Sequence, residues 1–240
     1  MIRDRFQYKS TITTILAEQD GSVRAAREAM MGARNDLETL IAKDPFFGTT
    51  FAPYRTEESA PLIAERMMNA AESATTGPMA AVAGTIAWAG AEAIKQAGAS
   101  CGVVDNGGDI ALFSDRELLI GLYAGQSPFS GKYALRIPPT NNICGICTSS
   151  ATVGPSISFG TADAVTVFSA DVARADAWAT ALCNQVTSAS GDGYLPPDDP
   201  AITGCLLICG SEMGQWGEVP EIVRAKVDEG RITVGDPALL

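Results

Sequence analysis

The sequence predicts an α+β fold, on the basis of three observations. Apolar residues recur at helical spacing in four separate stretches of the chain. Short apolar runs follow one another closely after residue 100, which is typical of successive strands. No internal repeat, low-complexity linker or heptad pattern divides the 240 residues. We therefore expect a single domain over residues 1–240, in which two lobes would meet without a clear linker.

The first part of the chain is predicted to hold strands followed by two helices. Residues 1–18 alternate apolar and polar side chains well enough for one or two strands, which end at "EQDGS". Helical spacing then predicts helices over about 22–43 and about 57–74. Pro61 falls near the first turn of the second helix, where its missing N–H costs little.

A third predicted helix, over 78–97, has an unusual composition. It opens with a proline, closes at a glycine, and consists almost entirely of small residues. Such a helix is apolar most of the way round and should be buried, as the floor of any cleft. Gly84 and Gly90 weaken a helix interior by roughly 1 kcal/mol each, so they indicate close packing or close approach of a ligand.

The remaining chain is predicted to be mostly strands, with one more helix. That helix covers about 172–186, and "GYLPPDDP" after it is predicted as a loop. The final apolar segments are "GCLLICG" and "EIVRAKV". The strands before the helix are predicted at 101–104, 110–113, 118–123, 133–137, 143–148 and 164–168.

Charge and composition exclude several functions. With a net charge of −11, the chain is not expected to attract nucleic acid or an anionic membrane. A phosphate-bearing ligand would have to be held locally, by backbone N–H groups or a divalent cation. There is no histidine, which excludes serine–histidine and cysteine–histidine catalysis within one subunit.

Neither a signal peptide nor an 18-residue apolar run is evident, so we expect a soluble, cytoplasmic protein. Its six cysteines are then expected to be thiols, because no basic residue near Cys144 or Cys147 would stabilise a thiolate. The "MM" pairs at 30–31 and 67–68 and "PFF" at 45–47 suit either the core or a homo-oligomer interface.

The stretch "VVDNGGDIAL" admits two interpretations. Asn-Gly between apolar runs is a strong signal for a tight hairpin. Alternatively, Gly107 and Gly108 let a ligand lie against the backbone, while Asn106 and Asp109 bind its polar edge.

Two further segments could carry chemistry. In "ARADAWATALC", Asp176 and Thr180 share one helix face and could coordinate a hard cation such as Mg²⁺. The alternative is an early-turn acid and a threonine bonded to its own helix, although a carboxylate among alanines needs a partner. In "CTSSATVGPS", five hydroxyl groups follow an apolar strand: Thr148, Ser149, Ser150, Thr152 and Ser156. They could bind phosphate or a heterocycle, or they could simply form a turn.

Taken together and in order, these segments resemble a known family. The chain resembles a prokaryotic family related to ApbE, the FAD:protein FMN transferases, from about Arg5 to Trp216. The strongest matches are "GPMAAVAGTIA", "VVDNGGDIAL", "YAGQSPFSGKYALRI", "GICTSSATVGPSISFGTADAVTV" and "ADAWATAL". The resemblance implies mixed or antiparallel sheets flanked by helices, with the ligand in a cleft between lobes.

The resemblance also implies a site. By position it places Mg²⁺ on Asp176 and Thr180, with the carbonyl of Ala83 as third ligand, and FAD as the nucleotide. Asp176 and Asp109 are the candidate catalytic residues if the chain is an enzyme. The residues expected to line the flavin or nucleotide are Asn106, Gly107, Gly108, Asp109, Thr148, Ser149 and Ser150.

Two departures from the transferase pattern weigh against FMN transfer. Transferases usually carry a lysine in the segment that matches Ala83 and Gly84, and a histidine element after the Thr-Ser motif; both are absent here. Each such group is commonly worth roughly two powers of ten in rate. Two other functions therefore stay open: an accessory protein of sulfur or cofactor metabolism that uses Cys147, or a non-catalytic module that binds a small anion.

Overall fold

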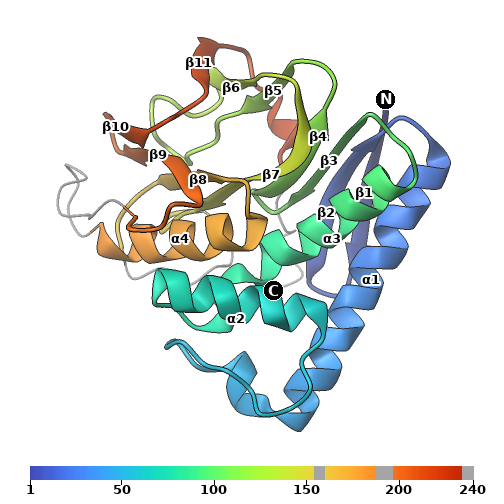
Figure 1. Ribbon diagram of the computed structural model, residues 1–240. Coiled ribbons are helices and arrows are strands. Elements are labelled where there is room, and N and C mark those ends of the chain that lie inside the picture. The colour runs from blue at the N-terminus through green and yellow to red at the C-terminus, as the bar shows by residue number, and fades with distance from the viewer. Residues whose placement is uncertain (154–159, 187–196, 234–240) are drawn as a thin grey trace.

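The computed structural model describes residues 1–153, 160–186 and 197–233, which form three layers (Figure 1). The central layer is an eight-stranded sheet of order β1-β2-β3-β4-β7-β8-β9-β10, in which every pair is antiparallel. Helices cover one face of this sheet, and a three-stranded sheet, β11-β6-β5, packs on the other. The predicted α+β class is confirmed.

The chain begins with the hairpin of β1 (Ile2–Tyr8) and β2 (Thr11–Ala17), followed by the long helix α1 (Asp20–Lys43). The other helices are the 3₁₀ turn η1 (Pro45–Gly48), α2 (Leu62–Ala74), the 3₁₀ turn η2 (Pro78–Ala81), α3 (Val82–Gln96), α4 (Val172–Gln185) and the 3₁₀ turn η3 (Glu229–Arg231). The remaining strands are β3 (Cys101–Asn106), β4 (Asp109–Ser114), β5 (Leu118–Gly121), β6 (Tyr133–Ile137), β7 (Thr140–Ser149), β8 (Ala164–Ser169), β9 (Ile202–Cys209), β10 (Glu212–Gly217) and β11 (Glu221–Arg224).

Both faces of the inner strands β3, β4, β8 and β9 are buried, which explains why these strands are largely apolar, whereas β1 and β10 are part-exposed. On β3, Val104 packs toward the helices while Val103 packs toward the small sheet. The same alternation separates Leu207 from Leu206 on β9. Because successive side chains of a strand point to opposite faces, a strand covered on both sides needs apolar residues at every position.

Several predicted boundaries are corrected by the structure. Helix α2 begins at Leu62 and Pro61 is its N-cap, so residues 57–61 are not helical. The small-residue helix is interrupted near its start, where Pro78–Ala81 forms a 3₁₀ turn. The sequence also failed to predict strand β10, whose burial pattern is mixed, and placed the end of β5 two residues too late.

The apolar segments that suited either core or interface are mostly core. Met30, Met67, Met68 and Phe47 are buried, whereas Phe46 is exposed. Gly90 lets α3 approach α1 closely, because a Cβ at this position would lie 3.1 Å from a side-chain carbon of Met30. Within the described residues, no helix has the length and apolar character needed to cross a membrane.

Candidate functional site

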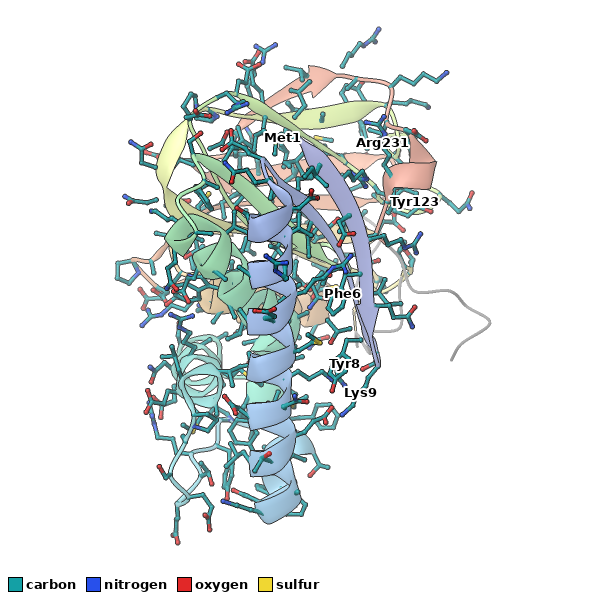
Figure 2. All side chains as sticks on the ribbon, turned by 90° about the vertical axis from the view of Figure 1, so that its right-hand side faces the viewer. Met1, Phe6, Tyr8, Lys9, Tyr123 and Arg231 are labelled. Carbon is teal, nitrogen blue, oxygen red and sulfur yellow. The ribbon has the colours of Figure 1, made fainter. Side chains whose placement is uncertain are left out.

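A cleft of about 1930 Å³ runs between the open face of the N-terminal strands, the small sheet and the helices. It extends along β1, whose ends are marked by Met1 and Lys9 in Figure 2; Tyr123 and Arg231 lie on its wall near the small sheet. Ten residues predicted for the site line this one cleft: Ala83, Asn106, Gly107, Gly108, Asp109, Thr148, Ser149, Ser150, Asp176 and Thr180. Thr152 does not line it, and its hydroxyl bonds Asp163 instead. Ser156 falls outside the residues that the structure describes.

The "NGGD" segment is both a hairpin turn and a wall of the cleft, so its two interpretations are compatible. Asn106 pairs with Asp109 across the β3–β4 ladder, and the glycines between them have φ of 71° and 105°. Such a turn favours glycine because both central residues are left-handed. The N–H of Gly108 donates to a carboxylate oxygen of Asp105 (2.9 Å), and the hydroxyl of Thr233 donates to the other oxygen.

One hydrogen bond ties the hairpin end to α3, and a second ties α3 to α4. The side-chain amide of Asn106 donates to the carbonyl of Ala83 (2.9 Å), and the backbone N–H of Gly84 donates to Oδ2 of Asp176 (2.7 Å). Side chains on paired β3 and β4 positions therefore meet the first turn of α3 and the face of α4. Of the helix predicted over 78–97, only η2 and the first turn of α3 line the cleft. The prediction that this whole helix forms the floor of the cleft is therefore wrong.

Asp109 and Asp176 form a buried pair of carboxyl groups. Burial raises the pKa of Asp176 to about 7, against the bond from Gly84, and the two side chains are in hydrogen-bonding contact. Burial also raises the pKa of Asp109, and the neighbouring charge of Asp176 raises it further. Oδ1 of Asp109 is buried and has no hydrogen-bond partner in the described part of the chain. Two neighbouring buried carboxyl groups therefore need a shared proton or a cation to offset their charge.

The hydroxyl cluster after β7 is largely engaged within the protein. The hydroxyl of Thr148 bonds that of Thr166 (2.8 Å), and the hydroxyl of Ser149 lies 3.2 Å from that of Thr180. Oγ of Ser150 accepts the backbone N–H groups of Thr152 and Val153. The turn interpretation thus holds for Ser150, while the pair of Ser149 and Thr180 faces the cleft beside Asp176.

The donor set suits a hard cation rather than a transition metal. The described residues contain no group of three or more His, Cys, Asp or Glu side chains placed to hold a metal ion. Around Asp176 they offer oxygen atoms instead: two carboxylates, the hydroxyl of Thr180 and the carbonyl of Ala83. Oxygen ligands are those that Mg²⁺ prefers, and the unpaired Oδ1 of Asp109 is an atom that a cation would satisfy.

The glycine at position 84 has a steric cause. A Cβ there would lie 2.9 Å from Cβ of Asp176 and 3.1 Å from the carbonyl oxygen of Val172. Helices α3 and α4 are therefore in close contact at this point, and a lysine would not fit on this backbone. At this position the backbone N–H of Gly84 donates to Asp176 instead.

The structure argues against Cys147 as a nucleophile. Its neighbours Ile146 and Thr148 line the cleft, but Cys147 points to the other face of the sheet, where its thiol lies 3.6 Å from the carbonyl of Val172. Burial raises its pKa well above the ordinary value, and the Asp109 charge adds to this. Burial likewise raises the pKa of Cys144 to about 11. None of the six cysteines, all within the described residues, forms a disulfide.

Two parts of the cleft were not predicted from the sequence. Arg3 on β1 and Lys226 and Arg231 near the small sheet are exposed cations along its wall. Between α2 and η2, Thr75 and Thr76 also line it. The only sequence signal for the first group is the alternation in "IRDRFQY", which marks one strand face as charged; we see none for the second.

Comparison with solved structures defines the class of protein. The flavin transferase ApbE from Vibrio cholerae, H257G mutant, aligns over 90% of this chain and 96% of its own, with a TM-score of 0.57 and 11% identity. The apo flavinyl transferase ApbE of Pseudomonas stutzeri aligns over 90% and 94%, with a TM-score of 0.50 and 14% identity. At these identities the comparison shows the fold alone: the chain has an ApbE-like fold.

Sequence comparison then gives the family. The family model described as "AbpE bacteria" matches residues 3–192, and the chain belongs to this family. The UPF0280 protein of Methanosphaerula palustris is 57% identical over 236 residues, which are 98% of this chain and 99% of that protein. The UPF0280 protein of Methanoculleus marisnigri is 56% identical over 237 residues, 98% of this chain and 96% of that protein. The resemblance noted from the sequence is confirmed.

Proposed function

We propose that this protein binds a flavin nucleotide, with FAD as the candidate, together with Mg²⁺ in the cleft. One observation carries the proposal: residues from β3, β4, β7, α3 and α4 that were chosen from the sequence all line the same cleft. The structural neighbours named as flavin transferases support the ligand class. We expect the protein to act in solution and without nucleic acid as a partner. A net charge of −11 disfavours binding to nucleic acid or to an anionic membrane.

The cation would be held by Asp176, Thr180 and the carbonyl of Ala83, with Asp109 beside them. When bound, Mg²⁺ would neutralise the two buried carboxylates and polarise a phosphoryl oxygen of the nucleotide. The residues themselves orient one another: Gly84 fixes one oxygen of Asp176, and Asn106 fixes the carbonyl of Ala83. The glycine turn leaves the backbone beside Asp109 open to a ligand, because a Cβ at Gly107 would meet nothing within 4 Å.

Two absent side chains favour flavin binding without FMN transfer. The chain has no histidine, and α4 leaves no room for a lysine at position 84. FMN transfer to a protein hydroxyl is therefore the second candidate, favoured by one observation. Burial raises the pKa values of Asp176 and Asp109, which makes their carboxylates better proton acceptors for an attacking hydroxyl. In that case these two residues are the catalytic ones.

The test is a fluorescence titration of FAD into the protein, with Mg²⁺ and with EDTA. Asp176→Ala is compared with Asp36→Ala, which removes the same charge from an exposed position on α1 that does not line the cleft. We expect saturable quenching with Mg²⁺ in the wild type and in Asp36→Ala, and its loss with EDTA or in Asp176→Ala. No saturable change at tens of micromolar FAD, which would detect binding of about −6 to −7 kcal/mol, would contradict the proposal.

A second assay separates the two candidates. The FAD-loaded protein is incubated with Mg²⁺ and a threonine-containing acceptor, and released AMP is measured. AMP release that depends on Asp176 and Asp109 indicates transfer, whereas binding without release leaves the binding function. If FAD does not bind, titration with inorganic pyrophosphate tests the small-anion module instead.

A further inference from the structure

The cleft contains a second polar group that the protein leaves unsatisfied. Among the described residues, four buried side-chain polar atoms have no hydrogen-bond partner: Thr76 Oγ1, Asp109 Oδ1, and one guanidinium nitrogen each of Arg136 and Arg174. The two guanidinium nitrogens still have a carboxylate oxygen within 3.6 Å. That leaves Thr76 and Asp109, and both line the cleft.

Thr76 lies in a segment whose position is tightly fixed. The residue is 8% exposed, and its backbone N–H donates to the carbonyl of Ala71 at the end of α2 (3.0 Å). The residue before it, Thr75, is left-handed with φ of 56°, a conformation that is rare for a β-branched residue. The residue after it, Gly77, is pressed against the 49–51 segment, since a Cβ there would lie 1.9 Å from the carbonyl oxygen of Thr50.

The surroundings of Thr76 indicate what the hydroxyl could bind. The same connection between α2 and α3 brings Met79 and Val82 to the cleft, so the lining near Thr76 includes large apolar side chains. Ligand pockets typically combine such a lining with a few placed polar groups that fix orientation. A buried hydroxyl without a partner is costly, and a strained neighbour adds to the cost, so both persist where function requires them.

We propose that the hydroxyl of Thr76 is a ligand contact, which bonds a carbonyl or ring nitrogen on the edge of the heterocycle that occupies the cleft. This inference rests on the proposed nucleotide-binding function. It assigns Thr76 a role in recognising the ring, separate from the cation site at Asp176.

The experiment compares Thr76→Val, which removes the hydroxyl at nearly constant shape, with Thr76→Ser, which keeps it. Thr39→Val is the matched control on α1, outside the cleft. Two quantities are measured for each: the melting temperature of the free protein, and the affinities for FAD, FMN and AMP in Mg²⁺. A purely structural hydroxyl would lower the first, whereas a ligand contact would lower only the second.

For Thr76→Val we expect a melting temperature equal to or above that of the wild type, by up to about 2–4 °C. We expect its FAD affinity to fall about tenfold, the usual worth of one hydrogen bond, while Thr76→Ser stays within about threefold of the wild type. A matching fall for either FMN or AMP identifies the ring that is bound.

A lower melting temperature together with unchanged FAD affinity in Thr76→Val would overturn the inference. Failure of the proposed function gives a different result, because the wild type itself then binds no FAD. The melting temperature still decides in that case: a rise in Thr76→Val supports an unsatisfied hydroxyl, and a fall shows that it is structural.

Discussion

Two buried aspartates at helix α4, Asp176 on the helix and Asp199 bonded to its Arg174, have opposite surroundings. Asp199, with a side chain 3% exposed, accepts bonds from the guanidinium of Arg174 (2.8 and 2.9 Å), the hydroxyl of Ser73 and the N–H of Ala201. Asp176, on the same helix as Arg174, faces Asp109 and receives backbone bonds but no cation. One carboxylate is satisfied by the protein; the other is not.

The pKa values follow from these surroundings. Burial tends to raise the pKa of Asp199, but its hydrogen bonds and the charge of Arg174 outweigh burial and lower it overall. At Asp176 burial dominates and the pKa rises to about 7. A buried acid with a complete set of partners stabilises the fold, whereas one without them in a cleft is poised for a ligand. Arg174 and its carboxylate also hold the 197–201 segment against α2, since Ser73 joins the network.

The largest expected effect is on the pH dependence of stability without metal. The folded-state pKa of Asp176 lies above its ordinary value of 3.8, so the folded protein binds more protons than the unfolded chain between pH 4 and 7. Stability should therefore fall as the pH rises through this window. Raising the pKa of Asp176 from 3.8 to about 7 corresponds to about 4 kcal/mol of unfolding free energy as an upper value.

Urea unfolding in EDTA from pH 4.5 to 8 measures this, in the wild type and in Asp176→Asn. The variant should have a shallower slope than the wild type, and the remaining slope should come from Asp109, whose pKa burial also raises. Mg²⁺ at pH 8 should restabilise the wild type alone. Identical slopes in the two proteins would show that Asp176 is not the group responsible.

The next effect concerns the satisfied acid. Arg174→Met leaves Asp199 buried without its cation, which we expect to cost about 3 kcal/mol, the low end for a broken buried pair because the arginine is a third exposed. Arg24→Met, at an exposed position of α1, should change the unfolding free energy by less than about 0.5 kcal/mol. Equal effects of the two substitutions on denaturant unfolding would remove the contrast between Asp199 and Asp176.

Two helix glycines test the contact beside Asp176. Gly32 on α1 has open space where a Cβ would lie, so Gly32→Ala should stabilise the protein by about 0.5–1 kcal/mol. Gly84→Ala instead forces a methyl group against Asp176. This substitution should destabilise the protein by about 1–2 kcal/mol, although alanine has a better helix propensity than glycine. Thermal unfolding of the two variants should move in opposite directions; stabilisation by both would mean that α3 and α4 separate readily.

The smallest effect is expected at Thr75. Glycine adopts a φ of 56° without strain, so Thr75→Gly should stabilise the free protein by up to about 1 kcal/mol, although glycine adds entropy to the unfolded chain. Thr75→Ala, which keeps Cβ but not the branch, should fall between the wild type and glycine. If glycine lowers the melting temperature, strain is not stored at this position.

The sequence predicted Asp176 better than Asp199 for a physical reason. Asp176 stands among alanines on an apolar helix, so its burial and its need for a partner are visible in a short window. Asp199 lies in a proline-rich loop, and its partners come from α2 and α4, which only the tertiary fold brings together. Short-range patterns cannot report contacts of this kind.

The same limit applies to the cleft. The "NGGD" segment indicated a hairpin turn because glycine favours the two successive left-handed conformations that this turn requires. Thr75 adopts a left-handed conformation against the preference of its side chain, so nothing in "SATTGP" announces it. The small sheet covers one face of the central sheet and the helices cover the other. Both faces carry apolar residues, so the sequence did not show which face the small sheet covers.

The burial of two neighbouring carboxyl groups, Asp109 and Asp176, has a consequence for the lifetime of the protein in the cell. Near neutral pH the empty cleft makes the free chain less stable than its occupied form, and ligand at a hundred times its Kd adds about 2.7 kcal/mol. Proteases that degrade transiently unfolded chains would thus remove empty copies in preference to loaded ones. If the proposed nucleotide and Mg²⁺ bind in the cleft, the abundance of this protein should follow their supply.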